Sequence, residues 1–442
     1  MNPVLPERNP PAATHRLRAW ITRLRNKDTV RYFVGKGFLL WPLNVLGVGL
    51  GFVSTILYAR LLTPEQYGQF AYVMAMMTLL GFLSLQGIYV SVSQAAAQGF
   101  DGSMVDGTRA RVRFSLLGTV AMTVVGLVCW RSKGPDVAIS YFIGAAVFPA
   151  FYSFDNGWAI LTGKKQFETF AKYRAMQMLT ITGATWVALL VTRRVPWVFG
   201  ANVGLTALTH FIFYHLAVSH FKTNDKVQPD SLNYGKRLSA LSVVTSVEVR
   251  LDQVVLGTFL PFAALGWFNM ASRINEAVMQ ETWYAIARLL FPRLAECSEQ
   301  EARRRARVWG AYLVAVFIVL AGLFWVFASW LLPVILGPAY IKSVSLSRWL
   351  VLISGFGLAW FIFELYFQAR AAEKPMWVAR LVLTGTHLAL LVLLIRPLGL
   401  TGVLISIAAA RAAAITTAAI WFRHNQSSRD SGVPRRTGGT FQ

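Results

Sequence analysis

The stretch Val308–Val334 reads VWGAYLVAVFIVLAGLFWVFASWLLPV and carries no charged side chain. A lipid bilayer has a hydrocarbon core about 30 Å thick, and a helix of about 20 apolar residues crosses it. The stretch therefore predicts a transmembrane helix. It is preceded by four basic residues, Arg303, Arg304, Arg305 and Arg307, which we interpret as part of a loop at one membrane surface.

Eleven similar stretches occur elsewhere in the chain, so the sequence predicts an all-α polytopic membrane protein with about 12 transmembrane helices. The expected spans are 37–59, 70–92, 114–130, 138–161, 175–191, 197–218, 239–260, 264–291, 308–334, 346–368, 377–395 and 399–422. The composition agrees, because 55% of the 442 residues are apolar and only 14% are charged. An average soluble protein has roughly 25% charged residues.

The net charge of +23 would suggest a nucleic-acid partner in a soluble chain. Here the basic residues lie mostly between the apolar stretches, so no nucleic-acid partner is expected. The two cysteines, Cys129 and Cys297, are about five spans apart, and they predict neither a disulfide nor a metal site. We expect no metal and no cofactor.

Lysine and arginine are concentrated in the N-terminal tail and in alternate loops, which indicates that these segments are cytoplasmic. The residues are Arg16, Arg18, Arg23 and Arg25; Arg109, Arg111 and Arg113; Lys164, Lys165, Lys172 and Arg174; Lys222, Lys226, Lys236 and Arg237; Arg303, Arg304, Arg305 and Arg307; and Arg370 and Lys374. The other loops are short and hold at most two each, such as Arg193 and Arg194. An even number of spans then predicts that both termini are cytoplasmic.

A weak internal repeat divides the chain into two halves. Leu62-Thr63-Pro64 and Gly68-Gln69-Phe70 match Leu260-Pro261 and Gly266-Trp267-Phe268, and Pro196 matches Pro397, each about 200 residues later. Each half has six spans and begins on the same side, which predicts parallel repeats related by an axis along the membrane normal. The expected domains are a basic cytoplasmic tail (1–32), a six-helix bundle (33–220), a cytoplasmic linker (221–236), a second six-helix bundle (237–422) and a cytoplasmic tail (423–442).

The stretch Tyr58–Phe70, YARLLTPEQYGQF, resembles the opening signature of Wzx-type polysaccharide flippases. These form the polysaccharide transporter family of the multidrug/oligosaccharidyl-lipid/polysaccharide exporter superfamily. Four shorter segments are also similar to that family: Leu251–Gly257, Leu265–Phe268, Leu290–Leu294 and Leu336–Tyr340. The resemblance covers roughly residues 33–422.

The resemblance implies two six-helix bundles around a central cavity that opens to one side at a time. It implies transport of undecaprenyl-pyrophosphate-linked oligosaccharide from the cytoplasmic to the periplasmic leaflet of the bacterial inner membrane. The product would be exopolysaccharide, capsule or the O-antigen of lipopolysaccharide. The expected partners are the lipid-linked oligosaccharide, the lipid bilayer, and a polysaccharide polymerase with glycosyltransferases.

Several ionisable residues lie inside the apolar stretches, where an unpaired charge costs a few kcal/mol and usually serves a pathway. Arg250, Arg273 and Arg411 are candidates for binding the pyrophosphate, because guanidinium groups form bidentate, charge-assisted hydrogen bonds with phosphate. Arg348 lies near the start of its span, and we expect it to extend to the interface.

Structural roles for these arginines stay open. Arg250 could pair with Glu276 or Glu281 on the next span, and Arg273 could pair with Glu276 one turn away. Arg411 lies in an alanine-rich segment without an acidic residue. This environment favours binding of an external anion by Arg411.

Four carboxylates are candidates for coupling transport to an ion gradient, because membrane-buried acids are the usual proton relays. They are Glu281, Glu364, Asp252 and Glu248. Glu364 could instead meet Arg370 or Lys374 at the interface. Asp155, with Asn156 beside it, stands at a comparable depth, and for it a structural role is as well supported.

Two other functions compete with the flippase hypothesis. A drug or cation exporter of the same superfamily would favour a cavity of carboxylates and aromatic rings, whereas here arginines are at least as prominent. A membrane-embedded polysaccharide polymerase, ligase or glycosyltransferase would need catalytic groups in sizeable extracytoplasmic loops. The intervening loops are short, and no nucleotide-sugar, P-loop or metal-ligand motif is present. We therefore expect a transporter without catalytic residues and not an enzyme.

Overall fold

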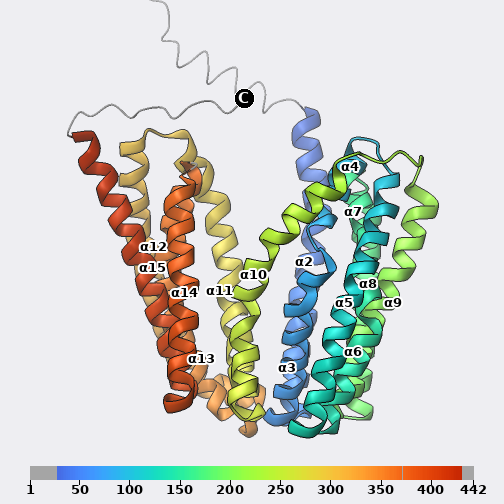
Figure 1. Ribbon diagram of the computed structural model, residues 1–442. Helices are drawn as coiled ribbons and strands as arrows, with labels where there is room; N and C mark the ends of the chain where they lie inside the picture. Colours follow the sequence, from blue (N-terminus) through green and yellow to red (C-terminus); the bar gives the residue numbers. More distant parts are fainter. Residues whose placement is uncertain (1–26, 371, 431–442) are drawn as a thin grey trace, which may run out of the picture.

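The computed structural model describes residues 27–370 and 372–430, and it describes side chains outside 27–41, 241–242, 244–249, 278–289, 292, 295, 373 and 423–430. The described chain is almost entirely helical (Figure 1). Its elements are α2 (Lys27–Leu61), α3 (Pro64–Leu80), the 3-10 helix η1 (Gly81–Ser84), α4 (Ile88–Ala97), α5 (Gly102–Ser132), α6 (Pro135–Ser153), α7 (Asn156–Gly163), α8 (Phe167–Val191), α9 (Val195–Phe221), α10 (Ser231–Phe259), α11 (Phe262–Glu296), α12 (Glu299–Leu336), the 3-10 helix η2 (Pro338–Tyr340), α13 (Ile341–Ala369), α14 (Glu373–Leu398) and α15 (Leu400–Asp430).

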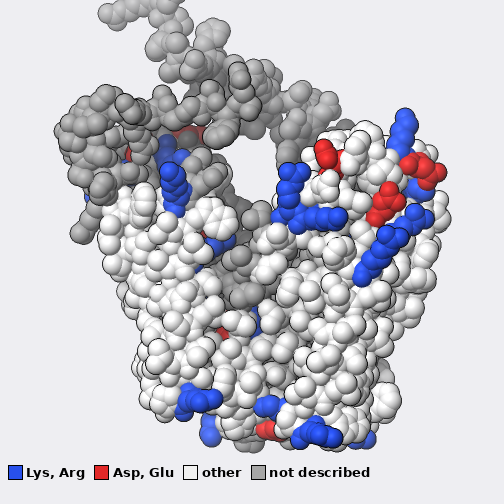
Figure 2. All heavy atoms as spheres, viewed as in Figure 1, with Lys and Arg blue, Asp and Glu red and all other residues white. Residues whose placement is uncertain are grey.

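The helices run back and forth between two sides of the molecule. We call the side where α2 begins and α15 ends the terminal side, and the opposite side the far side (Figure 1). Two of the passages consist of two consecutive helices, α3 with α4 and α6 with α7. The described chain therefore passes between the two sides twelve times. The predicted class, an all-α polytopic membrane protein with about 12 spans, is confirmed. Figure 2 shows a broad belt with few charged side chains, as expected of such a protein, with Lys and Arg gathered at both ends.

Local sequence explains where helices begin and bend. Helix α3 starts at Pro64 behind Thr63, whose side chain accepts from the Gln66 amide while the Gln66 side chain accepts from the Thr63 amide. This capping box satisfies two amides that the helix itself leaves free. The break between α3 and α4 contains Leu85, whose φ of 54° is left-handed and ends regular helix there.

Basic residues from five of the groups that we predicted in loops lie on helices instead. Arg109, Arg111 and Arg113 are on α5, the four arginines at 303–307 are on α12, Lys172 and Arg174 are on α8, Lys236 and Arg237 are on α10, and Lys374 is on α14. The prediction of loops was wrong because these helices extend several turns beyond their apolar segments, so charge alone did not indicate where they begin.

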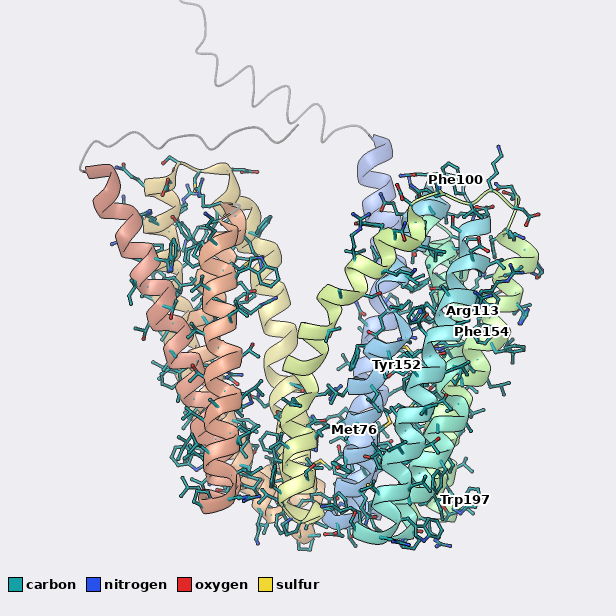
Figure 3. The ribbon with its side chains drawn as sticks, viewed as in Figure 1. Met76, Phe100, Arg113, Tyr152, Phe154 and Trp197 are labelled. Atoms are coloured by element: carbon teal, nitrogen blue, oxygen red, sulfur yellow. The ribbon has the colours of Figure 1, made fainter. Side chains whose placement is uncertain are left out.

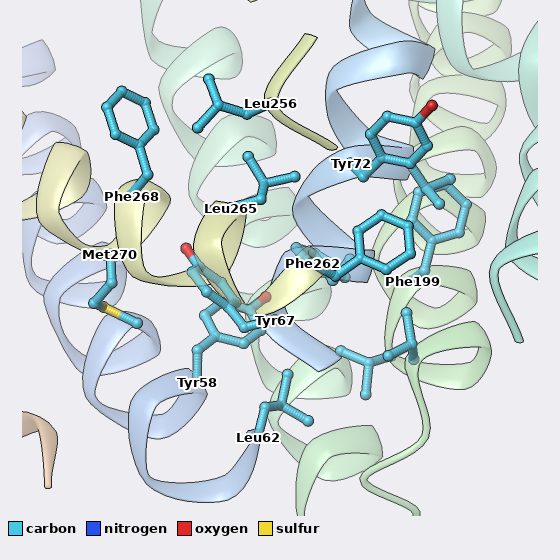
Figure 4. Packing of buried hydrophobic residues seen from close by; sticks show 14 of the residues in the cluster. Tyr58, Leu62, Tyr67, Tyr72, Phe199, Leu256, Phe262, Leu265, Phe268 and Met270 are labelled. Carbon is cyan, nitrogen blue, oxygen red and sulfur yellow. The ribbon is translucent and has the colours of Figure 1, made fainter. Parts of the chain in front are cut away.

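The buried core explains the shape of the molecule. One large hydrophobic cluster contains residues of both halves, such as Tyr67 and Tyr72 of α3 with Phe262 and Leu265 of α11 (Figure 4). Two smaller clusters on the terminal side each belong to one half: one includes Trp158 and Phe213, the other Trp360 and Phe422. The halves are therefore joined at the far side, and Figure 2 shows a hollow between them that opens on the terminal side.

Helix α10 connects the halves. It is the first helix of the second half in chain order, yet it packs on α3 and α4 as well as on α11 and α14. Its first turns touch α4 closely, because a β-carbon on Gly87 would lie 2.3 Å from the Ser239 nitrogen. The domain boundaries expected from the sequence stay a prediction.

Candidate functional site

Helices α10 and α11 differ from the other passages. By length and composition, the ten candidate membrane spans of the described chain cover every passage except these two. They carry most of the candidate charges: Glu248, Arg250, Asp252, Arg273, Glu276 and Glu281. Helix α11 packs on α3 of the first half, and Figure 1 shows both α10 and α11 between the two halves.

Arg273 lies where the two halves meet. Its guanidinium carbon is 5.7 Å from the centre of the Tyr58 ring of α2 and 6.0 Å from that of Tyr67 of α3. The two rings are themselves buried and stand 5.5 Å apart (Figure 4). The Arg273 side chain is nonetheless exposed. The aromatic faces stabilise the guanidinium, and the Tyr67 side chain is also a hydrogen-bond partner of Arg273. A guanidinium has five N–H donors, so the other donors stay open to a ligand.

Arg273 does not have the local partner that we weighed for it. No ion pair joins Arg273 to Glu276 in the described part of the chain, although Glu276 lies within electrostatic reach. Glu276 is exposed as well. A cation and an acid therefore stand one turn apart on α11, and neither is neutralised by a direct contact with the other.

Arg250 is half-buried on α10, and its Nη1 donates to Gln253 Oε1 at 3.3 Å. Its Nε is buried without a hydrogen-bond partner in the described structure. The alternative ion pair with Glu276 is not formed, and the side chain of Glu281 lies outside the described residues. Asp252 is within electrostatic reach of both Arg250 and Glu276, so these charges belong to one region.

Arg411 of α15 is half-buried, and its Nη1 donates to the Ile353 carbonyl of α13 at 2.9 Å. The next residue on α13, Ser354, donates to Asn275 of α11 at 2.9 Å. Asn275 is two residues from Arg273, so α13 connects the Arg411 site to the helix that borders the hollow. Like Arg273, Arg411 has a neutral partner and no ion pair among the described residues.

The remaining candidates are distributed more widely. Glu364 of α13 pairs with Arg380 of α14 at 2.9 Å, so the pairing with Arg370 or Lys374 that we considered is wrong. Arg370 instead donates to the carbonyls of Leu294 and Cys297. The side chain of Glu248, like that of Glu281, lies outside the described residues.

Arg348 is on the first turns of α13, near the far side. Its guanidinium carbon lies 5.3 Å from the Trp325 ring centre. Its Nε is buried and unpartnered in the described structure. The expected extension to the interface stays a prediction.

The sequence interpretation missed a buried cluster in the first half. Arg111 is fully buried and contacts Asp155 through a salt bridge, and its Nη1 also donates to Asn156 Oδ1 at 2.8 Å. Its Nε donates to the Ser84 carbonyl at 3.2 Å. Figure 3 shows Arg113 and Phe154, close neighbours of this pair in sequence, at the same level of the first half. The acid beside Asn156 was visible in the sequence, but its partner had been placed in a loop.

Charged side chains of the first half hold helix ends of the second half at the far side. Arg60 donates to the Val334 carbonyl and, at 2.9 Å, to the Ile335 carbonyl in the last turn of α12. Lys133 donates to the Gly257 and Thr258 carbonyls in the last turn of α10, at 3.0 and 3.3 Å.

A negative charge of the first half contacts the N-terminal end of a helix in the second half. Glu65 Oε2 accepts from the Ala263 amide in the first turn of α11 at 2.9 Å. Each charge has the sign that stabilises its helix end, because helix C-termini attract cations and N-termini attract anions. The far side is therefore closed by contacts between the halves. Among the described residues, no three His, Cys, Asp or Glu side chains converge as metal ligands.

Comparison with known proteins adds family and fold. A family model described as "Polysaccharide biosynthesis protein" matches residues 57–345. No curated protein sequence matches the chain.

Several solved structures share the fold. An inward-facing multidrug resistance MATE family transporter of the MOP superfamily has 17% identity and a TM-score of 0.61, and the match covers 88% of this chain and 96% of the other. The lipid II flippase MurJ, in an inward closed conformation, has 10% identity and a TM-score of 0.65, with 86% of each chain covered. An outward-facing MATE family transporter has 14% identity and a TM-score of 0.51, with 87% and 93% covered.

Proposed function

The chain belongs to the family described as polysaccharide biosynthesis proteins, and on this premise we propose that it is a flippase for a lipid-linked oligosaccharide. Its substrate is an undecaprenyl-pyrophosphate-linked oligosaccharide, moved from the cytoplasmic to the periplasmic leaflet of the bacterial inner membrane. The transported units serve synthesis of a surface polysaccharide. The protein acts with the polymerase and glycosyltransferases of that synthesis, and none of its own residues is assigned a catalytic role.

The observation that carries this proposal is the exposure of Arg273 and its lack of an acidic partner. Arg273 is exposed, its guanidinium rests on the Tyr58 and Tyr67 rings where the two halves meet, and it forms no ion pair among the described residues. A pyrophosphate brings about two negative charges into a region from which bulk water is partly excluded. Arginines without acidic partners offer it bidentate hydrogen bonds without first breaking an internal salt bridge. Arg250 and Arg411 supply further donors of the same kind.

The arrangement of the halves supports transport by alternating access. The joint hydrophobic core is at the far side, whereas the terminal side has two separate cores. The distribution of Lys and Arg supports placing both termini in the cytoplasm, so the hollow faces the leaflet in which lipid-linked precursors are assembled.

Coupling to an ion gradient is assigned to the carboxylates near the arginines. Asp252 lies within electrostatic reach of Arg250 and Glu276, so its protonation changes the charge of the region that binds the anion. Glu248, Glu281 and Glu364 are further candidates. Protonation of such an acid strengthens the local positive charge, and release of the proton weakens it.

The test uses a strain that lacks the gene and is complemented with single variants. Arg273→Ala, Arg250→Ala and Arg411→Ala are each expected to reduce surface polysaccharide about tenfold or more, since a hydrogen bond to a charged group is worth about 1.5–3 kcal/mol. Lipid-linked oligosaccharide should accumulate in the cytoplasmic leaflet. Arg273→Lys should restore part of the activity, because it keeps the charge and loses the bidentate geometry.

Arg348→Ala is the matched control, because Arg348 is also an arginine in a span beside an aromatic ring but lies near the far-side end of α13. It should retain polysaccharide at the wild-type level, with equal amounts of protein in the membrane. Normal polysaccharide in all three alanine variants would contradict the proposal. If the deletion strain instead became sensitive to organic cations with its polysaccharide intact, the cation-exporter alternative would take its place.

A further inference from the structure

A second cavity lies on the second half, apart from the hollow. It has a volume of about 180 Å³ and is bounded by α12, α13 and α15, without any residue of the first half or of α10 and α11. Its lining includes Arg307, Gly310 and Val314 of α12, Ile362 and Phe363 of α13, and Phe422 of α15. Apart from Arg307 and the ring of Tyr366, the lining is hydrocarbon.

The position of the cavity is the membrane surface on the terminal side. Phe422 ends the apolar span of α15, and Arg307 lies in the first turns of α12, before the apolar run that starts at Val308. Helix α12 exposes large apolar side chains on the neighbouring turns, such as Tyr312 at 70% and Val316 at 55%. Such a surface is covered by lipid in a membrane protein. The hydrocarbon chains of lipids are therefore the apolar groups available to enter the cavity.

The space exists because Gly310 has no side chain. The nearest atom to a β-carbon built there is a methyl group of Ile362 at 3.4 Å, so larger side chains would extend into the cavity. An apolar cavity of about 150 Å³ holds one benzene molecule. The cavity therefore accommodates a segment of roughly six carbons, which suits part of one acyl chain.

Near the opening of the cavity, basic side chains outnumber acidic ones. Arg303 pairs with Glu299 at 2.7 Å, and Arg305 pairs with Glu301. The two other arginines of the group, Arg304 and Arg307, are exposed and have no acidic partner among the described residues. They are three residues apart and thus share one face of α12. Two free cations at a membrane surface, next to an apolar cavity, match a phosphate with an attached acyl chain.

We propose that this cavity is a binding site for an anionic phospholipid of the surrounding bilayer. One acyl chain enters between α12 and α13 beside Gly310, and the phosphate is held by Arg304 and Arg307. The bound lipid fills space between helices of the second half and stabilises their packing. The proposal does not depend on the transport function, because the lining includes none of the residues assigned to transport and no residue of α10, α11 or the first half.

The experiment measures lipid retention and thermal unfolding of the purified full-length protein in detergent. Phosphatidylglycerol and phosphatidylcholine with identical acyl chains are added separately, and bound lipid is counted by native mass spectrometry. We expect about tenfold preferential binding of phosphatidylglycerol, with a matching rise in Tm, since a ligand bound only by the folded state raises its stability. The double variant R304A/R307A should lose this preference.

Gly310→Leu tests the apolar part separately, because it fills the cavity and leaves both arginines in place. It should weaken binding of phosphatidylglycerol about as much as R304A/R307A does, while Tm without added lipid stays at or above the wild-type value. Arg113→Ala is the matched control: Arg113 is an exposed arginine near the terminal end of α5, on the first half and away from this cavity, and its loss should leave the preference intact.

Three results would overturn the proposal. One is equal binding of the two phospholipids by the wild-type protein, and another is undiminished preference in R304A/R307A. The third is selective retention of a prenyl phosphate that phosphatidylglycerol does not displace, which would assign the cavity to the isoprenoid chain of a substrate.

Discussion

Gly68 of α3 and Gly266 of α11 lie against each other at the far side, 198 positions apart in the chain. A β-carbon on Gly68 would lie 1.8 Å from the Phe262 carbonyl oxygen, and one on Gly266 would lie 2.0 Å from the Pro64 carbonyl oxygen. These glycines are the residues that the internal repeat equates. The helices of the two halves thus approach backbone to backbone at equivalent positions, as small residues permit in membranes.

Gly68→Ala and Gly266→Ala should each shift the protein away from the state that is closed at the far side. Neither β-carbon fits unless α3 and α11 separate. The shift is measured as a longer distance between spin labels at Thr192→Cys and Leu398→Cys, with Cys129 and Cys297 replaced by serine. Gly322→Ala is the control, because no atom lies within 4 Å of its added β-carbon. An unchanged distance in both glycine variants would refute a gating role for this crossing.

Removing the helix-end contacts should have a smaller effect in the same direction. Arg60→Ala, Lys133→Ala and Glu65→Ala each delete one contact between a charge of the first half and a helix end of the second. Such contacts are worth about 0.3–1 kcal/mol each, so the triple variant should change the ratio of closed to open molecules about fivefold to a hundredfold. The same spin labels measure it. Arg194→Ala removes an ion pair with Asp136 inside the first half and should leave the distance distribution unchanged.

Arg111→Met should be among the most destabilising single substitutions in the first half. It leaves Asp155 without its buried partner, and breaking a buried ion pair in this way costs about 3–5 kcal/mol. Thermal unfolding in detergent gives the measurement, and Arg113→Met, at an exposed position two residues on, is the control. Replacing both partners, in R111M/D155L, should recover much of the loss. A Tm for Arg111→Met close to that of Arg113→Met would show that the pair contributes little.

Stability should depend on pH through Asp101, which lies in the loop before α5 on the terminal side. Burial raises its pKa, but hydrogen bonds from Lys164 and Thr223 outweigh burial and hold the pKa below the usual value of 3.8. The unfolded chain therefore binds a proton at higher pH than the folded protein does. The stabilisation by Asp101 is complete above the usual pKa and is lost as the pH falls through the lowered value.

The measurement is Tm against pH for the wild type and Asp101→Asn. The wild type should exceed the variant by a constant margin above about pH 5, and the margin should shrink on acidification. Asp106→Asn, at a partly exposed site one turn along α5, is the comparison and should show little margin at any pH. A margin for Asp101→Asn that grows on acidification would contradict the assigned direction.

Much of the fold was predictable from single segments of the sequence. A charge-free run such as Val308–Val334 has one favourable environment, the hydrocarbon core, and its backbone must then be helical to satisfy its own hydrogen bonds. Apolar stretches predicted all twelve passages, although α10 and α11 carry charges and are not among the ten candidate membrane spans. The predicted helix ends on the terminal side were inaccurate, because helices such as α5 and α12 continue with polar residues beyond the apolar core.

The candidate site was predictable only in part. The chain order shows which residues share a helix face, so the sequence could indicate Arg250, Arg273 and Arg411 as unusual charges and could suggest partners one turn away. The partners actually found are distant in sequence. Arg273 rests on Tyr58 and Tyr67, and Arg411 reaches Ile353.

The sequence by itself determined that the chain crosses a membrane about twelve times, in two halves that repeat. Only the tertiary structure decided which charges are neutralised and which stay open. Arg111 is paired with Asp155 and Glu364 with Arg380, whereas Arg273 contacts the Tyr58 and Tyr67 rings and has no ion pair among the described residues. The reason is physical: transfer of a segment into lipid depends on its own composition, whereas the pairing of a buried charge depends on which side chains of other helices come within a few ångströms of it.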